Sequence, residues 1–277
     1  MVLPIVLGTI AGQVTTPADT TGTYMYVQHG QSDVLQFTLS TPWDLSTASY
    51  TATSDVSLSL PREFTLTHAG TNGYIVSNTA DKIYRYALST AWDVTTIDGT
   101  ADENFDVSGK EVHPYGLEVK GDGTSIYVLG YSSDKVHQWD MSTANDLSTA
   151  SYHGYISTSS ESNAAGGLAF SLDGTKMYTG DQLNDEVHEY TLSTAWDVTT
   201  ASHENTLDVS AKESVCDGVA ISTDGTKLYI VGSGSDDVNE YTLSTAYDIS
   251  TASHSHTLDI SSNSNFPMSV CFNMTNI

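Results

Sequence analysis

Apolar and polar residues alternate with a period of two along most of this 277-residue chain. This spacing predicts half-buried β-strands, and we find no segment with the three-to-four spacing of a helix. The pattern is clearest between residues 167 and 209. Gly167–Ser171 is a short apolar run, Asp173–Gly174 is a tight-turn dipeptide, and Lys176–Thr179 resumes as the partner strand. Val187–Leu192 and Asn205–Val209 then predict a third and a fourth strand.

A ten-residue phrase repeats five times and divides the chain into equal units. Aligned on their first serines, the copies are 49, 53, 51 and 51 residues apart, and they occupy residues 39–48, 88–97, 141–150, 192–201 and 243–252. A period of this length, with four short strands in each unit, indicates one supersecondary unit packed repeatedly on itself. We therefore predict an all-β protein with one β-propeller of four-stranded blades, and interpret the phrase as the long connection from third to fourth strand.

The two ends of the repeat region predict how the ring closes. Phe266–Asn273 matches the first strand of a blade but has no second strand after it, and Thr23–Val27 matches a second strand. We expect the two to complete one blade, giving five blades and no free sheet edge. The alternative is that Ile5–Val14 is itself an inner strand and opens a sixth position. Residues 15–277 are thus assigned to the propeller and residues 1–14 to an edge or docking strand.

Charge and cysteine content exclude several classes of function. Nine Lys and Arg face 34 Asp and Glu, giving a net charge of −25. Such a surface repels phosphate backbones and anionic lipids, so we expect neither nucleic-acid binding nor membrane insertion. The segment Val2–Ile10 lacks a basic start and is not interpreted as a signal peptide. Cys216 aligns with prolines and Cys271 with alanines of other repeats, so both are interpreted as small apolar residues.

The blade pattern resembles β-propeller repeats of the broad YVTN, NHL and WD40-like type. The stretch Tyr190–Ala201 looks like repeats in proteins of marine phages and aquatic bacteria, and the similarity runs from about Thr20 to Asn273. This resemblance implies the fold and a phage or aquatic setting, but no activity, because propellers host many functions. Trp92–Asp93 follows the third strand and lacks a Gly-His partner, so it is not the WD40 signature.

Aromatic residues at one fixed point of the phrase are candidate sugar platforms. They are Trp43, Trp92, Trp196 and Tyr247, with Asn145 in the third copy. The simpler interpretation is structural: the rings fill space between blades, and the aspartate that follows each one satisfies turn amides.

No catalytic or metal-binding motif is recognisable. Aspartates before the third strands (Asp33, Asp81, Asp134, Asp185 and Asp237) are interpreted as turn residues, because calcium prefers ligands clustered in one loop. The histidines lack a zinc spacing. The inner-strand ends, where propeller hydrolases gather metal ligands, are aligned as Arg62, Pro114, Ala165, Asp217 and Met268, a poor metal shell. We predict no metal, no cofactor and no enzymatic activity.

The loops that differ between repeats are the best candidates for specificity. Loops that vary on a repeated scaffold are where binding residues concentrate. Three of the nine basic residues lie there, and our predicted contact patch consists of Arg62, Lys110, His113, Tyr115, Lys212 and Asp217.

These features predict a propeller that binds and does not catalyse. From the resemblance, the expected form is a phage virion accessory, decoration or tail protein. It would lie on the virion surface as one of many copies and contact a host surface glycan or a neighbouring virion protein. Two alternatives stay open: a secreted, extracellular lectin with repeated sugar pockets, and a propeller hydrolase or lactonase.

Overall fold

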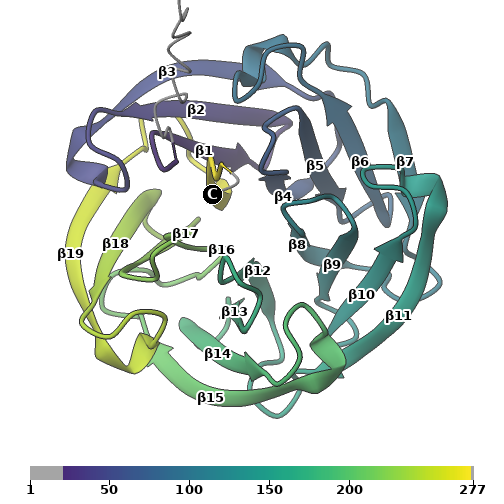
Figure 1. The fold of residues 1–277 in the computed structure, drawn as a ribbon. Coiled ribbons are helices and arrows are strands. Elements are labelled where there is room, and N and C mark those ends of the chain that lie inside the picture. The colour runs from purple at the N-terminus through teal and green to yellow at the C-terminus, as the bar shows by residue number, and fades with distance from the viewer. Residues whose placement is uncertain (1–20, 276–277) are drawn as a thin grey trace, which may run out of the picture.

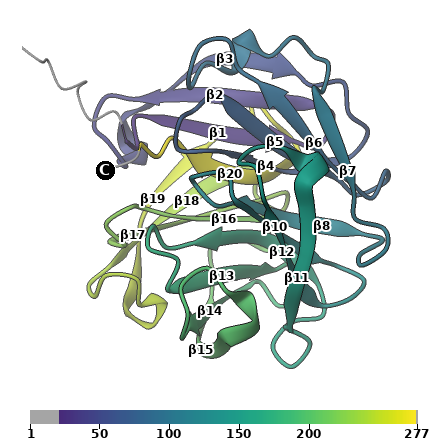
Figure 2. The same ribbon diagram turned by 45° about the vertical axis from the view of Figure 1, so that its right-hand side comes forward.

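The structure, a computed structural model, describes residues 21–275. In this part of the chain, five four-stranded antiparallel sheets surround a central axis (Figure 1). The fourth strands form the outer rim, and β11 is turned toward the reader in Figure 2. The predicted five-bladed propeller is therefore confirmed.

The blades are numbered in chain order, and their strands are given from the axis outward. Blade 1 comprises β20 (Pro267–Phe272), β1 (Tyr24–His29), β2 (Asp33–Leu39) and β3 (Ala48–Asp55). Blade 2 comprises β4 (Pro61–Leu66), β5 (Asn72–Ser77), β6 (Lys82–Ala87) and β7 (Glu103–Asp106). Blade 3 comprises β8 (Pro114–Val119), β9 (Ser125–Gly130), β10 (Lys135–Met141) and β11 (Ala150–Ser157). Blade 4 comprises β12 (Ala165–Phe170), β13 (Lys176–Asp181), β14 (Glu186–Leu192) and β15 (Ala201–Asp208). Blade 5 comprises β16 (Gly218–Ile221), β17 (Lys227–Gly232), β18 (Asp237–Leu243) and β19 (Ala252–Asp259).

Ring closure follows the predicted pairing of the two ends. β20 pairs antiparallel with β1, with Val270 opposite Val27, and the N–H of Gly22 donates to the carbonyl of Asn273 at 2.9 Å. The inner strand of blade 1 therefore comes from the C-terminal end of the propeller. The predicted edge or docking segment, residues 1–14 with Val2–Ile10, lies outside the described residues.

Each copy of the phrase contains a short 3₁₀ helix, which the apolar spacing did not predict. The five helices are η1 (Leu45–Thr47), η2 (Val94–Thr96), η3 (Leu147–Thr149), η4 (Val198–Thr200) and η5 (Ile249–Thr251). The phrase aspartate caps each one, as where the Asp44 carboxylate accepts from the N–H of Ser46. A three-residue helix is too short to show a helical period in the sequence. No helix within residues 21–275 is long and apolar enough to cross a membrane.

A tyrosine of each second strand hydrogen-bonds to the phrase of the following blade. Tyr229 of blade 5 donates to the carbonyl of Trp43 in blade 1 at 2.6 Å. The other four donors are Tyr26 to the Trp92 carbonyl, Tyr74 to the Asn145 side chain, Tyr127 to the Trp196 carbonyl and Tyr178 to the Tyr247 carbonyl. These hydroxyls reach across the apolar layers between blades, where the second-strand tyrosines are buried. The fixed point of the phrase thus joins neighbouring blades.

A second bond links each 3₁₀ helix to the preceding blade. Its first N–H donates to a third-strand Gln or Glu: Leu45 to Glu240, Val94 to Gln36, Val198 to Gln138 and Ile249 to Glu189. In blade 2 the matching third-strand residue is Arg85, which cannot accept. Glu103 of β7 accepts from Leu147 at 2.9 Å instead, and pairs with Arg85 at 3.4 Å.

The turns before the third strands correct one sequence alignment. Asp81, Asp134 and Asp185 share a positive φ with Asp236 and Ser32. Asp33 and Asp237 instead begin β2 and β18. The alignment was wrong by one residue in blades 1 and 5, because the turn position there is held by the preceding residue.

We expect Tyr229→Phe to lower the free energy of unfolding by about 1 kcal/mol, because a buried hydroxyl–carbonyl bond is lost. Tyr50→Phe is the matched control, since its hydroxyl contacts Thr53 at the exposed surface. Urea unfolding of both variants measures the difference. Equal effects at the two positions would contradict a role for Tyr229 in joining blades 5 and 1.

Candidate functional site

The five inner strands surround a small pocket, with a cavity volume of about 30 Å³, that is partly open to solvent. Its lining is mostly apolar, with residues such as Leu117, Leu168 and Val219 from successive blades. The polar groups include Glu63, Glu118, His68 and Cys271. A mostly apolar pocket with a few convergent polar groups is the usual form of a ligand site.

Glu63 is a buried carboxyl group on the axis, only 4% exposed. Its side chain accepts from the N–H of Leu117 at 2.6 Å and of Leu168 at 3.2 Å, so it joins blade 2 to blades 3 and 4. Burial, with the nearby Glu118, raises the pKa of Glu63 well above its usual value, although the two amide bonds oppose this. The residues at the same register of the other inner strands are Gly116, Gly167, Gly218 and Ser269. Sequence reasoning missed Glu63, although one Glu among small residues was a readable signal.

Glu118 is the second carboxyl group in the pocket. One of its oxygens accepts from the Thr65 hydroxyl at 3.0 Å and from the N–H of Val119 at 2.9 Å. Burial raises the pKa of Glu118 to about 7 despite these bonds. Near neutral pH this carboxyl group therefore exchanges a proton inside an apolar pocket.

At the other end of the inner strands, the structure brings together three residues of the predicted patch. The Arg62 guanidinium lies 4.2 Å from the centre of the Tyr115 ring. Asp217 accepts from Gln182 at 2.7 Å and from the N–H of Ser233 at 2.8 Å. Asp217 is only 4% exposed, and burial raises its pKa to about 6. Its carboxylate connects the β15–β16 loop to the β17–β18 loop. Asp217 therefore stabilises these loops in addition to belonging to the predicted patch.

The register here differs from our alignment of the inner-strand ends. Counted back from the paired residues Phe64, Leu117, Leu168, Val219 and Val270, the equivalent positions are Arg62, Tyr115, Gly166, Asp217 and Met268. Pro114 and Ala165 were each wrong by one residue: they are equivalent to Pro61 and Pro267, which precede Arg62 and Met268. The five blades thus place five different residues at this point.

Lys110, His113 and Lys212 interact with residues outside the inner strands. The Lys110 amine lies 4.1 Å from the centre of the Tyr152 ring on outer strand β11. His113 contacts Ser132 in the β9–β10 loop. The pKa of His254 in β19 is lowered, mainly by burial and secondly by the nearby charge of Lys212. The predicted patch therefore separates into an axial group and a peripheral group.

The predicted sugar platforms lie at the opposite ends of the blades. Trp43, Trp92, Trp196 and Tyr247 are half-buried, and their rings cover the turn glycines Gly22, Gly70, Gly174 and Gly225. A Cβ at Gly22 would lie 2.3 Å from the Trp43 ring. Trp196 also lines the central pocket. One face of each ring is thus occupied by its own blade.

We call the end with the fourth-to-first and second-to-third strand connections the loop face, and the other end the turn face. Backbone bonds join the two kinds of loop, as from Tyr131 to His113 at 3.0 Å. Five of the eight exposed large hydrophobic residues of the described chain are on the loop face: Leu60, Val112, Tyr131, Leu183 and Phe266. The other three are tyrosines on outer strands.

Comparisons with known proteins agree on the fold alone. No family model and no curated protein matches the chain. A nidogen/laminin complex has a TM-score of 0.57 at 11% identity, covering 92% of this chain and 99% of that one. A protein from Lactobacillus plantarum gives 0.54 at 13%, covering 90% and 71%. A putative 6-phosphogluconolactonase from Bacteroides fragilis gives 0.53 at 12%, covering 91% and 70%. At these identities the similarity establishes a β-propeller and no activity.

We expect Glu118→Gln to stabilise the protein at pH 8 and to have little effect at pH 4. The native pKa of about 7 exceeds the ordinary 4.5, so the contribution of Glu118 to stability is greatest below pH 4.5 and is lost as the pH rises through 7. At 1.36 kcal/mol per pKa unit, ionising Glu118 costs on the order of 3 kcal/mol. Glutamine keeps an oxygen for Thr65 and Val119 without the charge. Urea unfolding at both pH values is the measurement, and the same change at each pH would contradict the burial effect.

We expect methyl methanethiosulfonate to modify Cys271 but not Cys216 in the native protein. Cys271 lines the pocket and is partly exposed, whereas Cys216 is fully buried, and both are free thiols. Burial raises the pKa of Cys271, so its reaction should be slower than that of a free thiol. Peptide mass spectrometry distinguishes the two, and equal labelling would contradict an open pocket.

Proposed function

We propose that this chain is a non-enzymatic binding propeller that docks one protein partner through its loop face. The observation that carries the proposal is the set of exposed apolar side chains there. Three of the five, Leu60, Val112 and Leu183, are aliphatic. Protein partners bury aliphatic groups readily, whereas sugars stack on aromatic rings. Aliphatic exposure therefore favours a protein partner over a glycan.

Charge supports the same face. Lys110 and Lys212 belong to its loops, Arg62 is the second residue of β4, and Lys82 and Lys135 begin the third strands beside them. Five of the nine basic residues are thus at the loop face of a chain with net charge −25. Acidic residues such as Asp106, Glu111 and Asp208 lie at the same end, so the basic groups are individual contact points and the face as a whole is not basic.

The blades differ in the residues at the loop-face ends of their inner strands. This difference supports binding of one partner and not of several identical ligands. The repeated phrase is occupied by bonds between blades, whereas the axial end of each inner strand carries a different residue, such as Arg62, Tyr115 or Asp217. A lectin with repeated pockets would need the same groups in each blade. One asymmetric surface matches one docking event for each chain.

The setting that we propose comes from the resemblance of the repeats to those of marine phages. The partner is then a neighbouring virion protein, and the chain is one of many copies on a capsid or tail. A host glycan and a secreted location are the other outcomes to be tested.

A hydrolase acting in the central pocket is a second candidate. Glu118 favours it, because a carboxyl group with a pKa of about 7 suits proton transfer near neutral pH. Hydrolysis of a lactone panel by the native chain, lost in Glu118→Gln, would support this candidate over the first.

The docking proposal is tested by cross-linking mass spectrometry on virus particles purified from the aquatic source. Lysines mark both faces: Lys82, Lys110, Lys135 and Lys212 the loop face, and Lys120, Lys176 and Lys227 the turn face. We expect cross-links to other virion proteins from the first group. We also expect Leu183→Ser, at a residue 72% exposed, to weaken binding to particles at least tenfold. Tyr50→Ser, at an outer-strand residue 44% exposed, should bind as the native chain does.

Cross-links confined to the turn face, or equal binding by both variants, would overturn docking at the loop face. Absence of the chain from particles would overturn the virion setting, and specific capture on a glycan array would then favour the lectin.

A further inference from the structure

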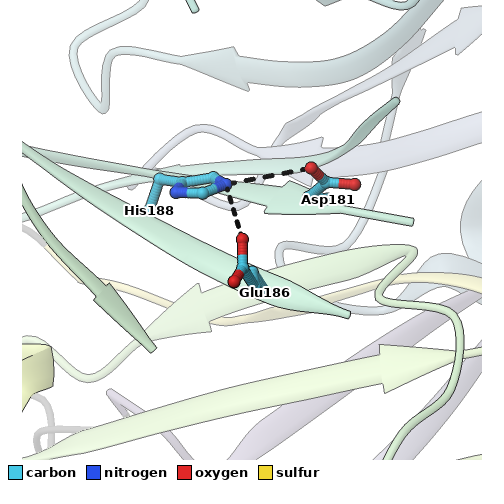
Figure 3. A group of neighbouring side chains, drawn as sticks. All are labelled: Asp181, Glu186 and His188. Atoms are coloured by element: carbon cyan, nitrogen blue, oxygen red, sulfur yellow. Dashed lines mark ion pairs between the residues drawn. The ribbon is translucent and has the colours of Figure 1, made fainter. Parts of the chain in front are cut away.

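Three potential metal ligands meet at the end of the β13–β14 hairpin in blade 4 (Figure 3). Asp181, the last residue of β13, is paired directly with Glu186, the first of β14. His188 follows two residues later, so its side chain is on the same face of the strand as Glu186. The closest ligand atoms of the three side chains all lie within 4.8 Å of one another.

The imidazole of His188 has one occupied and one unpartnered nitrogen. Its Nδ1 lies 3.1 Å from the hydroxyl of Thr206, which fixes the ring orientation. Its Nε2 is buried and has no hydrogen-bond partner, in a side chain only 2% exposed. This nitrogen points between Asp181, at 3.9 Å, and Glu186, at 3.8 Å (Figure 3). A buried polar atom without a partner costs free energy, so we expect a ligand to occupy the space next to this nitrogen.

The two separations suit a shared metal ion better than hydrogen bonds. Both exceed hydrogen-bond length. Ligands that each lie roughly 2.0–2.2 Å from one tetrahedral metal ion are instead roughly 3.3–3.6 Å apart, so both carboxylates need to approach the imidazole by only a few tenths of an ångström. Glu186 is the partly exposed member of the group, at 31%, so a small rotation of its side chain closes the set and gives an ion access from solvent.

Blade 3 provides a natural comparison at the same register. His137 occupies the position of His188, but Gly130 and Lys135 replace the two acids. There the Nε2 lies 3.2 Å from the Ser133 hydroxyl, and the Nδ1 lies 3.1 Å from the hydroxyl of Tyr152. Without carboxylates at these two positions, this histidine has both nitrogens satisfied. The unpartnered nitrogen is therefore a property of blade 4 and not of the repeat.

Asp181 is held rigidly as a charged ligand. One oxygen accepts from the N–H groups of Leu183 and Asn184, and the other accepts from the Asn184 side chain at 2.9 Å. These three bonds fix the orientation of the carboxylate before any ion arrives.

We propose that Asp181, Glu186 and His188 bind one divalent first-row transition metal ion. One imidazole and two carboxylates form a three-ligand set that leaves a coordination position for water, and zinc suits this donor set. Calcium and magnesium are disfavoured, because they take six or more oxygen ligands and rarely an imidazole. The site lies in a second-to-third strand connection and thus on the loop face.

The test is isothermal titration of the full-length chain with zinc chloride after treatment with a chelator. We expect one site in the native chain and no comparable binding of magnesium. His188→Gln and Glu186→Gln should each weaken this site at least tenfold, whereas His137→Gln, the blade 3 control, should leave it unchanged. Glu186 is partly exposed, so its variant provides a test that does not depend on replacing a buried residue.

Cobalt(II) provides a second readout at the same site. We expect visible absorption bands of protein-bound cobalt in the native chain and in His137→Gln, and their loss in Glu186→Gln. No zinc site in the native chain, or unchanged affinity in both Glu186→Gln and His188→Gln, would overturn the proposal.

Discussion

The close approach of five inner strands at the axis is the constraint on which the rest of the structure depends. At one register each inner strand meets the next blade directly. Gly116, Gly167 and Gly218 leave no room for a side chain: a Cβ at Gly218 would lie 2.6 Å from the Cα of Ser269. Ser269 accepts from the N–H of Phe64 at 3.1 Å, and Glu63 reaches two further strands. Five blades therefore close with side-chain bonds at two contacts and bare backbone at the other three.

The outer parts of the blades are joined by bonds that repeat with the sequence. The tyrosine of the second strand and the Gln or Glu of the third both reach the phrase of the next blade. Blade 2 shows that the bond matters more than the residue that makes it, because Glu103 accepts where Arg85 cannot. The repeat thus encodes adhesion between blades. Residues free of this role, on the loop face, are those in which the blades differ.

The sequence predicted the fold well, because each blade carries its own copy of the strand and turn signals. The pairing of Phe266–Asn273 with the N-terminal strands was also predictable, since a lone inner strand needs a partner. Single-residue register was less accessible. The inner strands β4, β8, β12 and β20 are each irregular near their first residue, and the alternation of apolar residues does not reveal this. The group around His188 escaped for a related reason: Asp181 and Glu186 are brought together by a turn, so their spacing resembles no linear zinc motif.

The path of the chain through blade 1 has a further consequence. The N–H of Thr275 donates to the Thr21 hydroxyl at 3.1 Å, beside the bond between Gly22 and Asn273. Residues 21 and 275 are therefore neighbours, and a short linker between them would turn β20 and β1 into an ordinary hairpin. New ends opened in the turn of any other blade would then give a circular permutant with the same ring. In such a chain a different blade would contain strands from both ends of the chain. The packing between blades would be unchanged, so it does not depend on which blade closes the ring.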